Sequence, residues 1–501
     1  MSSAAVPSLG RRVARSALAA GALWYLGAYL AVALARLSYP YDLEWMEGGM
    51  LEHVARVLGG QTLYGPPSLE FTPYIYTPLY YLLAAPVAKL FGLRLLSLRV
   101  VSFAASLGVF ALIAALVRGG TRSRLGVLVA VGLYAALFKR SGAFFDLARV
   151  DSLALLLTLL GTWLLLASER HDVAAGVVLA AAFFTKQSAL LIGAPVVLAR
   201  AWSLRGPRRL QSISAFGALV VGGSALLHLR TGGWSTYYLF TLPASHPRVS
   251  AAWLGFWRDD LLFAVPIALL AVVFVVGRTR EKGGPPLVVL AAVLGALADA
   301  WSSRLHSGGY SNVLMPAYAC LAWQTGTVLG WLDEPDAAVG PGVSRRRALA
   351  ACAPWACLLQ LALLWYPPWR QVPTSADRAA GDALVAKLAA TPGPALVPFH
   401  PHLGRLAGKA TYAQQMALSD VMRGGDRRAA GLLATDVRRR LAAREFDAVV
   451  VDEDWWPEEL RAAYVRSGAL FSGQPDVFWP RTGWPTRPRD SYAPRPVPLA
   501  P

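Results

Sequence analysis

Three carboxylates, Asp42, Glu44 and Glu47, lie within six residues of one another in an aromatic segment of the chain. Helix capping explains one of them, because an Asp side chain accepts hydrogen bonds from the first N–H groups of a helix, and the helix dipole favours an acid there by about 0.3 to 1 kcal/mol. Capping needs only one acid, and three acids beside Tyr39 and Tyr41 are typical of a general base, a divalent-metal site or both. The sequence leaves both interpretations open, a helix cap and a chemical site.

A second polar group, where a later apolar stretch begins, contains Asp146 and the neighbouring residues Arg149 and Asp151. Arg149 and Asp151 either pair with each other or face a polar cavity, and a cavity is favoured because an ionised Asp inside a membrane helix costs about 2.5 to 3.5 kcal/mol. Lys186 lies between two further apolar stretches and either reaches toward lipid head groups or binds a phosphate. Arg248 and Arg304 extend this pattern, since guanidinium groups offer phosphate several donors in a fixed geometry.

The composition indicates what kind of protein must position these residues. The chain has 501 residues, of which 55% are hydrophobic and 16% charged, as expected of a helical protein that crosses a membrane many times. Its net charge of +18 would suggest nucleic acid binding in a water-soluble protein, but the arginines cluster in short loops between apolar stretches, as orientation signals do. Nucleic acid is therefore not an expected partner. The three cysteines fall in predicted spans, which excludes a disulfide framework or a zinc quartet.

Apolar stretches predict about eleven membrane spans, the first at residues 16–37. Arginines in front of this span place the N-terminus in the cytoplasm. Residues 78–92 are apolar but short for a crossing and contain a proline, so we expect them to lie along the membrane or re-enter it. The basic loops, including residues 278–282, then face the cytoplasm, and the acidic segment faces outward. The other predicted spans are 95–117, 125–138, 152–168, 173–185, 187–202, 212–229, 259–277, 285–300, 313–332 and 348–366.

Directly after the acidic segment, apolar residues recur at helical spacing: Met50, Leu51, Val54, Val57 and Leu58. This spacing predicts an amphipathic helix whose apolar face lies on the bilayer. The helix would begin at the acids and would therefore fix their position.

The chain is expected to fall into three parts. Residues 1–370 form the membrane part, with a long first outer loop at 38–94. Residues 371–473 alternate between helical and short apolar patterns, which predicts a small α/β domain outside the membrane. Residues 474–501 are rich in Pro and Arg and predict an irregular tail. The fold class is thus mostly α, with an extracytoplasmic C-terminal domain.

The pattern resembles the GT-C class of polyprenyl-phosphate-sugar-dependent membrane glycosyltransferases, which includes protein O-mannosyltransferases and lipid A aminoarabinose transferases. The resemblance covers about residues 16–330 and rests on the order and common outer-face placement of short motifs. Relatives often have two consecutive prolines where the first outer loop closes, whereas this chain has Thr77 and Pro78. The motifs are Asp42-Leu43-Glu44, Tyr76-Thr77-Pro78-Leu79-Tyr80-Tyr81, Arg149 with Asp151, Thr185-Lys186-Gln187, and Gly309 with Asn312.

The resemblance implies that an aspartate of the first outer loop is the catalytic base, which corresponds to Asp42, with Glu44 beside it. It also implies that acids and a histidine near the base hold a divalent metal ion where the enzyme uses one, with Asp42, Glu70 and His246 as candidate ligands. The candidate ligands of the donor phosphate are Lys186, Arg304, Arg248 and Arg149. The candidate substrate-binding residues are Glu47, Tyr76, Tyr80, Asp151, Tyr310 and Asn312.

We therefore expect an integral glycosyltransferase of the cell membrane. It would move a hexosyl or pentosyl group from a polyprenyl-phosphate donor to a glycan, lipid or protein acceptor at the outer face, with inversion of the anomeric carbon. The alternative is a transporter or flippase of a lipid-linked saccharide, which would use the same cations and aromatic residues without a base. A transporter is expected to show paired repeats and broken helices at the membrane midplane, whereas here the polar residues gather at one face.

Overall fold

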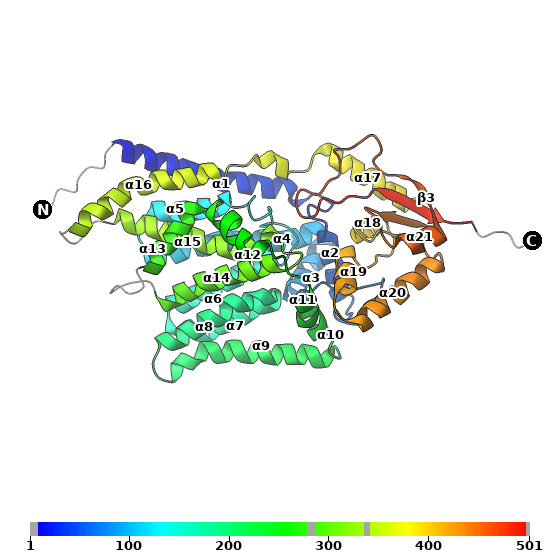
Figure 1. The fold of residues 1–501 in the computed structure, drawn as a ribbon, viewed down its shortest axis with the longest axis horizontal. Coiled ribbons are helices and arrows are strands. Elements are labelled where there is room, and N and C mark those ends of the chain that lie inside the picture. Colours follow the sequence, from blue (N-terminus) through cyan, green and yellow to red (C-terminus); the bar gives the residue numbers. More distant parts are fainter. Residues whose placement is uncertain (1–8, 278–285, 335–340, 497–501) are drawn as a thin grey trace, which may run out of the picture.

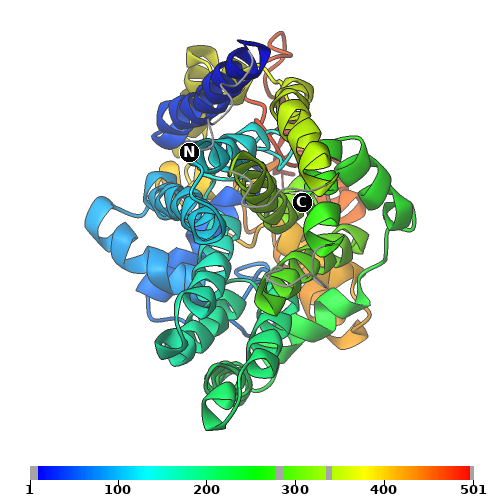
Figure 2. The same cartoon turned by 90° about the vertical axis from the view of Figure 1, so that its left-hand side faces the viewer.

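The chain folds into a long, mostly helical body with a small mixed region at one end (Figure 1). The computed structural model describes residues 9–277, 286–334 and 341–496. Helices from the first three quarters of the chain pack side by side along the long axis, and Figure 2 shows this bundle from its end. The long and medium helices of the bundle are α1 (Leu9–Leu37), α4 (Leu95–Gly120), α5 (Arg124–Ala136), α6 (Asp151–Ala167), α7 (Asp172–Thr185), α8 (Leu190–Ser203), α9 (Gln211–Arg230), α13 (Pro266–Gly277), α14 (Leu287–Leu305), α15 (Met315–Asp333) and α16 (Pro341–Leu363).

Shorter elements connect these helices. α2 (Glu47–Leu58) and α3 (Leu79–Phe91) lie in the predicted first outer loop, next to the C-terminal region (Figure 1). α3 is the apolar stretch that is too short to cross, with Pro86 inside it. Between α9 and α13 the short elements are α10 (Trp234–Thr236), α11 (Leu242–Ser245), α12 (Ala252–Gly255) and the π-helical segments Tyr237–Thr241 and Phe256–Leu262.

Within the described residues, four helices are individually long and apolar enough to span a membrane, or up to six if each of two bent helix pairs is one span. The pairs bend by 97° and 49°. Helices α5 to α8 fall on predicted spans but have only 13 to 17 residues, fewer than the roughly 20 that a crossing needs. The count of about eleven spans and the cytoplasmic N-terminus therefore stay predictions. The basic loop at 278–282 lies outside the described residues.

The expectation that the apolar face of α2 lies on the bilayer is wrong. Met50 and Val54 are completely buried and belong to a core that also contains Tyr74 of the first loop and Leu418 of the C-terminal region. The C-terminal region supplies an apolar partner for α2 that the local sequence pattern does not reveal. The acidic segment is consequently enclosed by protein on the side of this helix.

The C-terminal region is built around a four-stranded sheet with the order β1-β2-β4-β3. β1 and β2 pair in parallel, while β4 pairs antiparallel with both β2 and β3. Helix and short apolar strand alternate along this region as the sequence predicted. The elements are α17 (Ser375–Ala389), β1 (Ala395–Leu396), α18 (Pro401–Leu406), α19 (Gln415–Arg423), α20 (Arg427–Ala442), β2 (Ala448–Val451), α21 (Pro457–Ala463), β3 (Tyr464–Ala469) and β4 (Asp490–Pro494).

The predicted irregular tail, residues 474–501, contributes a strand to this sheet. Its residues 490–494 form β4, which lies between β2 and β3. Earlier in the same segment, the backbone N–H groups of Arg481 and Thr482 both donate to the carbonyl of Leu43, at 2.8 and 3.1 Å. The described part of this segment thus connects the sheet to the acidic first loop, although its Pro-rich composition suggests no such role. Residues 497–501 lie outside the described range.

Candidate active site

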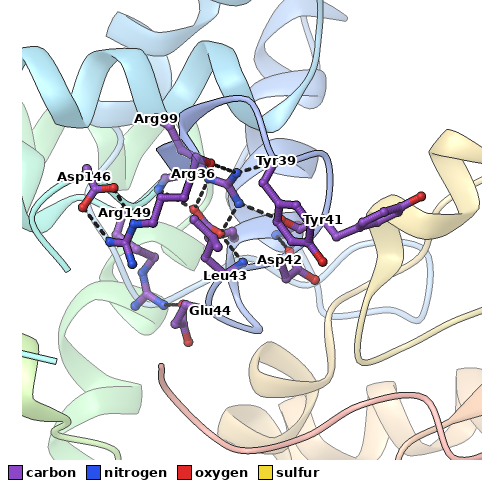
Figure 3. A network of polar contacts seen from close by, with 12 residues as sticks. Arg36, Tyr39, Tyr41, Asp42, Leu43, Glu44, Arg99, Asp146 and Arg149 are labelled. Carbon is purple, nitrogen blue, oxygen red and sulfur yellow. Dashed lines mark hydrogen bonds and ion pairs between the residues drawn. The ribbon is translucent and has the colours of Figure 1, made fainter. Parts of the chain in front are cut away.

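Two buried arginines, Arg36 and Arg99, lie beside the acidic first loop (Figure 3). Arg36, near the end of α1, donates to both carboxylate oxygens of Asp146 at 2.7 and 2.6 Å. Arg99 of α4 donates to the carbonyls of Tyr39 and Tyr41 at 2.5 and 2.7 Å. Both guanidinium groups are fully buried, and removing one partner of a buried ion pair costs about 3 to 5 kcal/mol. Arg99 therefore fixes the loop from a helix that is distant in sequence, while Arg36 fixes the segment that precedes α6.

Glu47 is part of this anchor. Its carboxylate receives two hydrogen bonds from Arg99, at 2.9 and 2.6 Å, and one each from the backbone N–H groups of Ala148 and Leu43. Burial by itself would raise the pKa of Glu47, but Arg99 and the backbone donors hold it below its usual value. The geometry favours a structural role for Glu47 over the predicted contact with substrate.

A cavity of about 780 Å³ opens between the helical bundle and the C-terminal region. This volume lies within the usual range for small-molecule sites, roughly 300 to 1,000 Å³. Its walls come from the first loop, from the segments that precede α6 and join α7 to α8 and α14 to α15, and from α19 and the turns after β2 and before β4. The charged side chains in the wall are Glu44, Arg149, Lys186, Asp420, Arg423 and Glu453.

Glu44 is the carboxylate of the acidic segment that faces this cavity. Its Oε2 accepts a hydrogen bond from Arg149 at 2.5 Å (Figure 3). The same guanidinium donates to the Tyr76 hydroxyl at 2.7 Å. Glu44 and Arg149 are only 2% and 3% exposed. Burial raises the pKa of Glu44 to about 7, although Arg149 acts in the opposite direction. A carboxylate whose pKa is close to the working pH is suited to accept a proton from a substrate hydroxyl.

Lys186, Asp151 and Asn312 meet on another wall of the cavity. The Lys186 ammonium and the Asn312 amide both donate to Oδ1 of Asp151, at 2.8 and 2.9 Å. Lys186 and Asn312 line the cavity, whereas Asp151 lies behind them with its Oδ2 buried and without a hydrogen-bond partner among the described residues. Asp151 therefore pairs with Lys186 and not with its sequence neighbour Arg149.

Asp42 does not line the cavity, and its position supports the capping interpretation. Its Oδ1 accepts a hydrogen bond from the backbone N–H of Gly48, in the first turn of α2, at 2.9 Å. The N-cap residue Met46 offers no side-chain hydrogen bond of its own. The other carboxylate oxygen of Asp42 contacts Nδ1 of His400, from the C-terminal region, at 2.7 Å. The role of Asp42 as a base stays a prediction, and Glu44 is the acid of this segment that lines the cavity.

The other predicted site residues divide between the cavity and its surroundings. Tyr76 and Tyr310 line the cavity. Tyr80 is completely buried between α3 and α4, where its hydroxyl contacts the Leu98 carbonyl and the Ser102 hydroxyl at 3.1 and 3.0 Å.

Arg304 lies behind the cavity wall. It donates to Asp260 at 2.8 Å and to the carbonyl of Gly309, a lining residue, at 2.9 Å. Arg248 is exposed and pairs through its backbone with His306. Of the four predicted phosphate ligands, the structure brings Arg149 and Lys186 to the cavity.

The three predicted metal ligands contact different neighbours. Asp42 contacts His400, His246 contacts His306 at 3.0 Å, and Glu70 is exposed within the first loop. The described residues contain no group of three or more His, Cys, Asp or Glu side chains arranged to hold a metal ion. Asp42, Glu70 and His246 thus do not fit together as a metal site.

Arg423, Glu453 and Trp484 are cavity residues that the sequence did not single out. Arg423 donates to Asp420 at 2.5 Å and to the Ser307 hydroxyl at 3.3 Å. Burial raises the pKa of Asp420 to about 6, with Arg423 opposing the shift. Trp484 is 56% exposed. These residues come from the C-terminal region, and no local motif connects them to acids more than 350 positions earlier.

Comparisons with known proteins identify the family and the fold of the chain. Residues 74–329, just over half of the chain, match the family model of glycosyltransferase family 87. The solved structure of ArnT from Cupriavidus metallidurans bound to undecaprenyl phosphate is similar, with a TM-score of 0.58 at 13% identity over 94% of this chain and 97% of ArnT. No curated protein matches the sequence.

An oligosaccharyltransferase from Archaeoglobus fulgidus, in complex with Zn and sulfate, is also similar, with a TM-score of 0.51 at 11% identity over 87% of this chain and 68% of that one. At such identities the likeness establishes a shared fold. The family match covers the segment that carries Tyr76, Arg149, Lys186 and Asn312, and it sets the transporter alternative aside. The chain therefore belongs to glycosyltransferase family 87 and is a multi-pass membrane glycosyltransferase of the GT-C type.

Proposed function

We propose that the protein transfers a sugar from a polyprenyl-phosphate donor to an acceptor hydroxyl at the outer face of the membrane, with inversion of the anomeric carbon. The observation that carries this proposal is the cavity in which buried Glu44 lies beside Arg149, with Lys186 in the same wall. A base and two cations are what displacement of a phosphate by a hydroxyl requires. The similar ArnT structure holds undecaprenyl phosphate, a ligand of the expected donor class.

In this reaction Glu44 accepts the proton of the acceptor hydroxyl while the oxygen attacks the anomeric carbon. The bond between that carbon and the phosphate oxygen breaks, and polyprenyl phosphate leaves from the opposite side, which inverts the carbon. Arg149 and Lys186 stabilise the negative charge that develops on the leaving phosphate. Asp151 and Asn312 position the Lys186 ammonium through their contacts behind the wall.

The C-terminal region is proposed to shape the acceptor site. It supplies the cavity wall that contains Arg423, Glu453 and Trp484, which offers hydrogen-bond donors, acceptors and an aromatic face. A glycan, a lipid head group or a protein side chain with a free hydroxyl would be the acceptor class.

The proposal is tested by incubating purified protein with polyprenyl-phosphate sugars and candidate acceptors in lipid nanodiscs. The measured quantity is loss of the donor and formation of a glycosylated product of inverted configuration. Wild-type protein should consume at least one donor, and a Glu44→Gln variant should not. Loss of donor at equal rates in both proteins would contradict the assignment of the base.

The pH dependence of transfer is expected to report Glu44. Because burial raises its pKa to about 7, kcat/KM should fall about tenfold per pH unit below that value as the carboxylate becomes protonated. A bound donor phosphate would share the Arg149 guanidinium with the Glu44 carboxylate. The guanidinium then neutralises Glu44 less, and the pKa of Glu44 in the complex rises further. The fall in kcat should therefore begin at a higher pH than the fall in kcat/KM. The same pH dependence for kcat and kcat/KM would argue against sharing of Arg149 between Glu44 and the donor phosphate.

Replacing Lys186 by Gln is expected to weaken donor binding at least tenfold. A hydrogen bond to a charged group contributes about 1.5 to 3 kcal/mol, and the Lys186 ammonium lies in the cavity wall. Arg304→Gln is the matched control, because Arg304 contacts Asp260 and a carbonyl behind the wall and should change affinity less. Binding of a non-hydrolysable donor analogue measures both, and equal effects would place the phosphate elsewhere.

A further inference from the structure

One buried imidazole links the acidic first loop to the C-terminal region. Nδ1 of His400 lies 2.7 Å from Oδ2 of Asp42, and its Nε2 lies 2.9 Å from Oδ2 of Asp452, which follows β2. The Thr486 hydroxyl donates to the same Asp452 oxygen at 2.7 Å. All three members of the Asp42–His400–Asp452 bridge are at least nine-tenths buried. The bridge joins residues that are 358 positions apart in the chain.

The bridge holds the imidazole in its charged form. Burial alone would lower the pKa of His400, but the carboxylates of Asp452 and Asp42 on its two ring nitrogens raise it to about 10. Both ring nitrogens of the imidazolium donate, one to each carboxylate. Charge-assisted hydrogen bonds of this kind are shorter and about twice as strong as neutral ones.

Contacts on either side of the bridge hold the same two segments together. The carbonyl of Leu43 accepts the N–H groups of Arg481 and Thr482, and Glu44 forms an isolated parallel bridge with Thr482. Gly48 of α2 faces His402, and a Cβ at Gly48 would lie 2.5 Å from Nδ1 of that imidazole. The first loop and the C-terminal region are therefore in direct, close contact on both sides of Glu44.

We propose that His400 is a positioning residue for sugar transfer: by bridging Asp42 and Asp452 it fixes the first loop so that the Glu44 carboxylate faces the cavity. The inference rests on the proposed function of Glu44 as the base. His400 does not line the cavity, so it acts through the loop and not on the substrate. The C-terminal region, beyond contributing a wall, thereby controls the geometry of the reacting carboxylate.

The kinetic test compares His400→Asn with wild type. Asn retains one donor for Asp42 but cannot reach Asp452 and carries no charge. A misplacement of about 1 Å can cost about 10²-fold in rate, so kcat should fall by about 10- to 100-fold while the affinity for a donor analogue is unchanged. Asp454→Asn is the matched control, since Asp454 is exposed and pairs only with Arg489 at 3.2 Å among the described residues. A His400→Asn protein with unchanged kcat, or an equal loss in Asp454→Asn, would overturn the proposal.

A double-mutant cycle separates positioning from general destabilisation. If His400 acts through Asp42, the variant carrying both Asp42→Asn and His400→Asn should lose little more activity than the worse single variant. Multiplicative losses would overturn the proposed link. The milder Thr486→Val substitution leaves the bridge itself intact and should lower kcat less than His400→Asn, so it gives a folded reference.

Hydrogen–deuterium exchange tests the bridge without any donor. In His400→Asn, peptides that cover residues 39–48 and 481–486 should exchange faster than in wild type, while peptides from α5 exchange at the same rate. Unchanged exchange in the first loop would overturn the bridge as a positioning device. A wild-type protein that consumes no donor, with the expected exchange pattern, would instead count against the proposed function.

Discussion

Replacing Glu44 by Gln is expected to lower the rate of sugar transfer by about 10² to 10⁴, the usual contribution of a general base. Gln has the same shape and still accepts a hydrogen bond from Arg149, but it cannot take a proton from the acceptor. Donor affinity should change little, because the cations of the cavity remain. Single-turnover transfer and binding of a donor analogue, measured on the same protein, separate these two effects.

Asp42→Asn distinguishes this assignment from a base at Asp42. Asn caps a helix about as well as Asp, so the variant should fold. The Asp42 carboxylate helps to raise the pKa of Glu44, and its removal should move the acid limb of kcat/KM to lower pH while substantial activity remains. Loss of transfer by about 10² or more in Asp42→Asn, with Glu44→Gln still active, would place the base at Asp42. The exposed residue Glu70 provides the control substitution, Glu70→Gln.

The sequence places three acids together but could not decide which of them faces the cavity. Local spacing places Asp42, Glu44 and Glu47 within six residues, and no local pattern separates them. Their directions are set by distant partners: Arg99 holds Glu47, His400 holds Asp42, and Arg149 reaches Glu44. Long-range pairing of this kind is a property of the tertiary packing, which a single sequence does not display.

Helix positions were predictable because they depend on local hydrophobic periodicity. The helices α4, α14 and α15 fall on predicted apolar stretches, and the α/β alternation after residue 371 follows the same kind of signal. The apolar face of α2 was assigned to lipid because its true partner, the core that contains Leu418, lies in the C-terminal region. β4 was missed for a related reason, since a Pro-rich segment becomes a strand only through pairing with β2 and β3.

The predicted phosphate ligands also show that sequence position alone does not reveal which cations line the cavity. Lys186 and Arg304 both follow from their positions at the ends of apolar stretches, but only the folded chain shows Lys186 in the cavity and Arg304 against Asp260. Arg423 was unpredictable because it is one arginine among many in a basic chain. The positions of cations in the sequence therefore give candidates for a phosphate site, and the folded structure shows which of these candidates line the cavity.

Arg149→Gln is expected to produce the second large loss, about 10³-fold in kcat/KM at pH 7. The guanidinium has two proposed tasks, a phosphate contact worth about 1.5 to 3 kcal/mol and neutralisation of the buried Glu44 carboxylate. Without Arg149 the pKa of Glu44 rises above about 7, so most of the base is protonated at neutral pH. The loss from the missing phosphate contact and the loss from protonation of Glu44 multiply in kcat/KM.

The two contributions of Arg149 can be separated by pH. In Arg149→Gln, raising the pH to about 9 should deprotonate Glu44 again and recover the part of the loss that comes from protonation, while the loss in donor affinity remains. Arg149→Lys keeps the charge but not the fork that reaches both Glu44 and Tyr76, so it should retain a lower pKa at Glu44 and lose less activity. A loss in Arg149→Gln that does not depend on pH would show that Arg149 acts on the donor alone, and Glu44 would then have to be tuned by other groups.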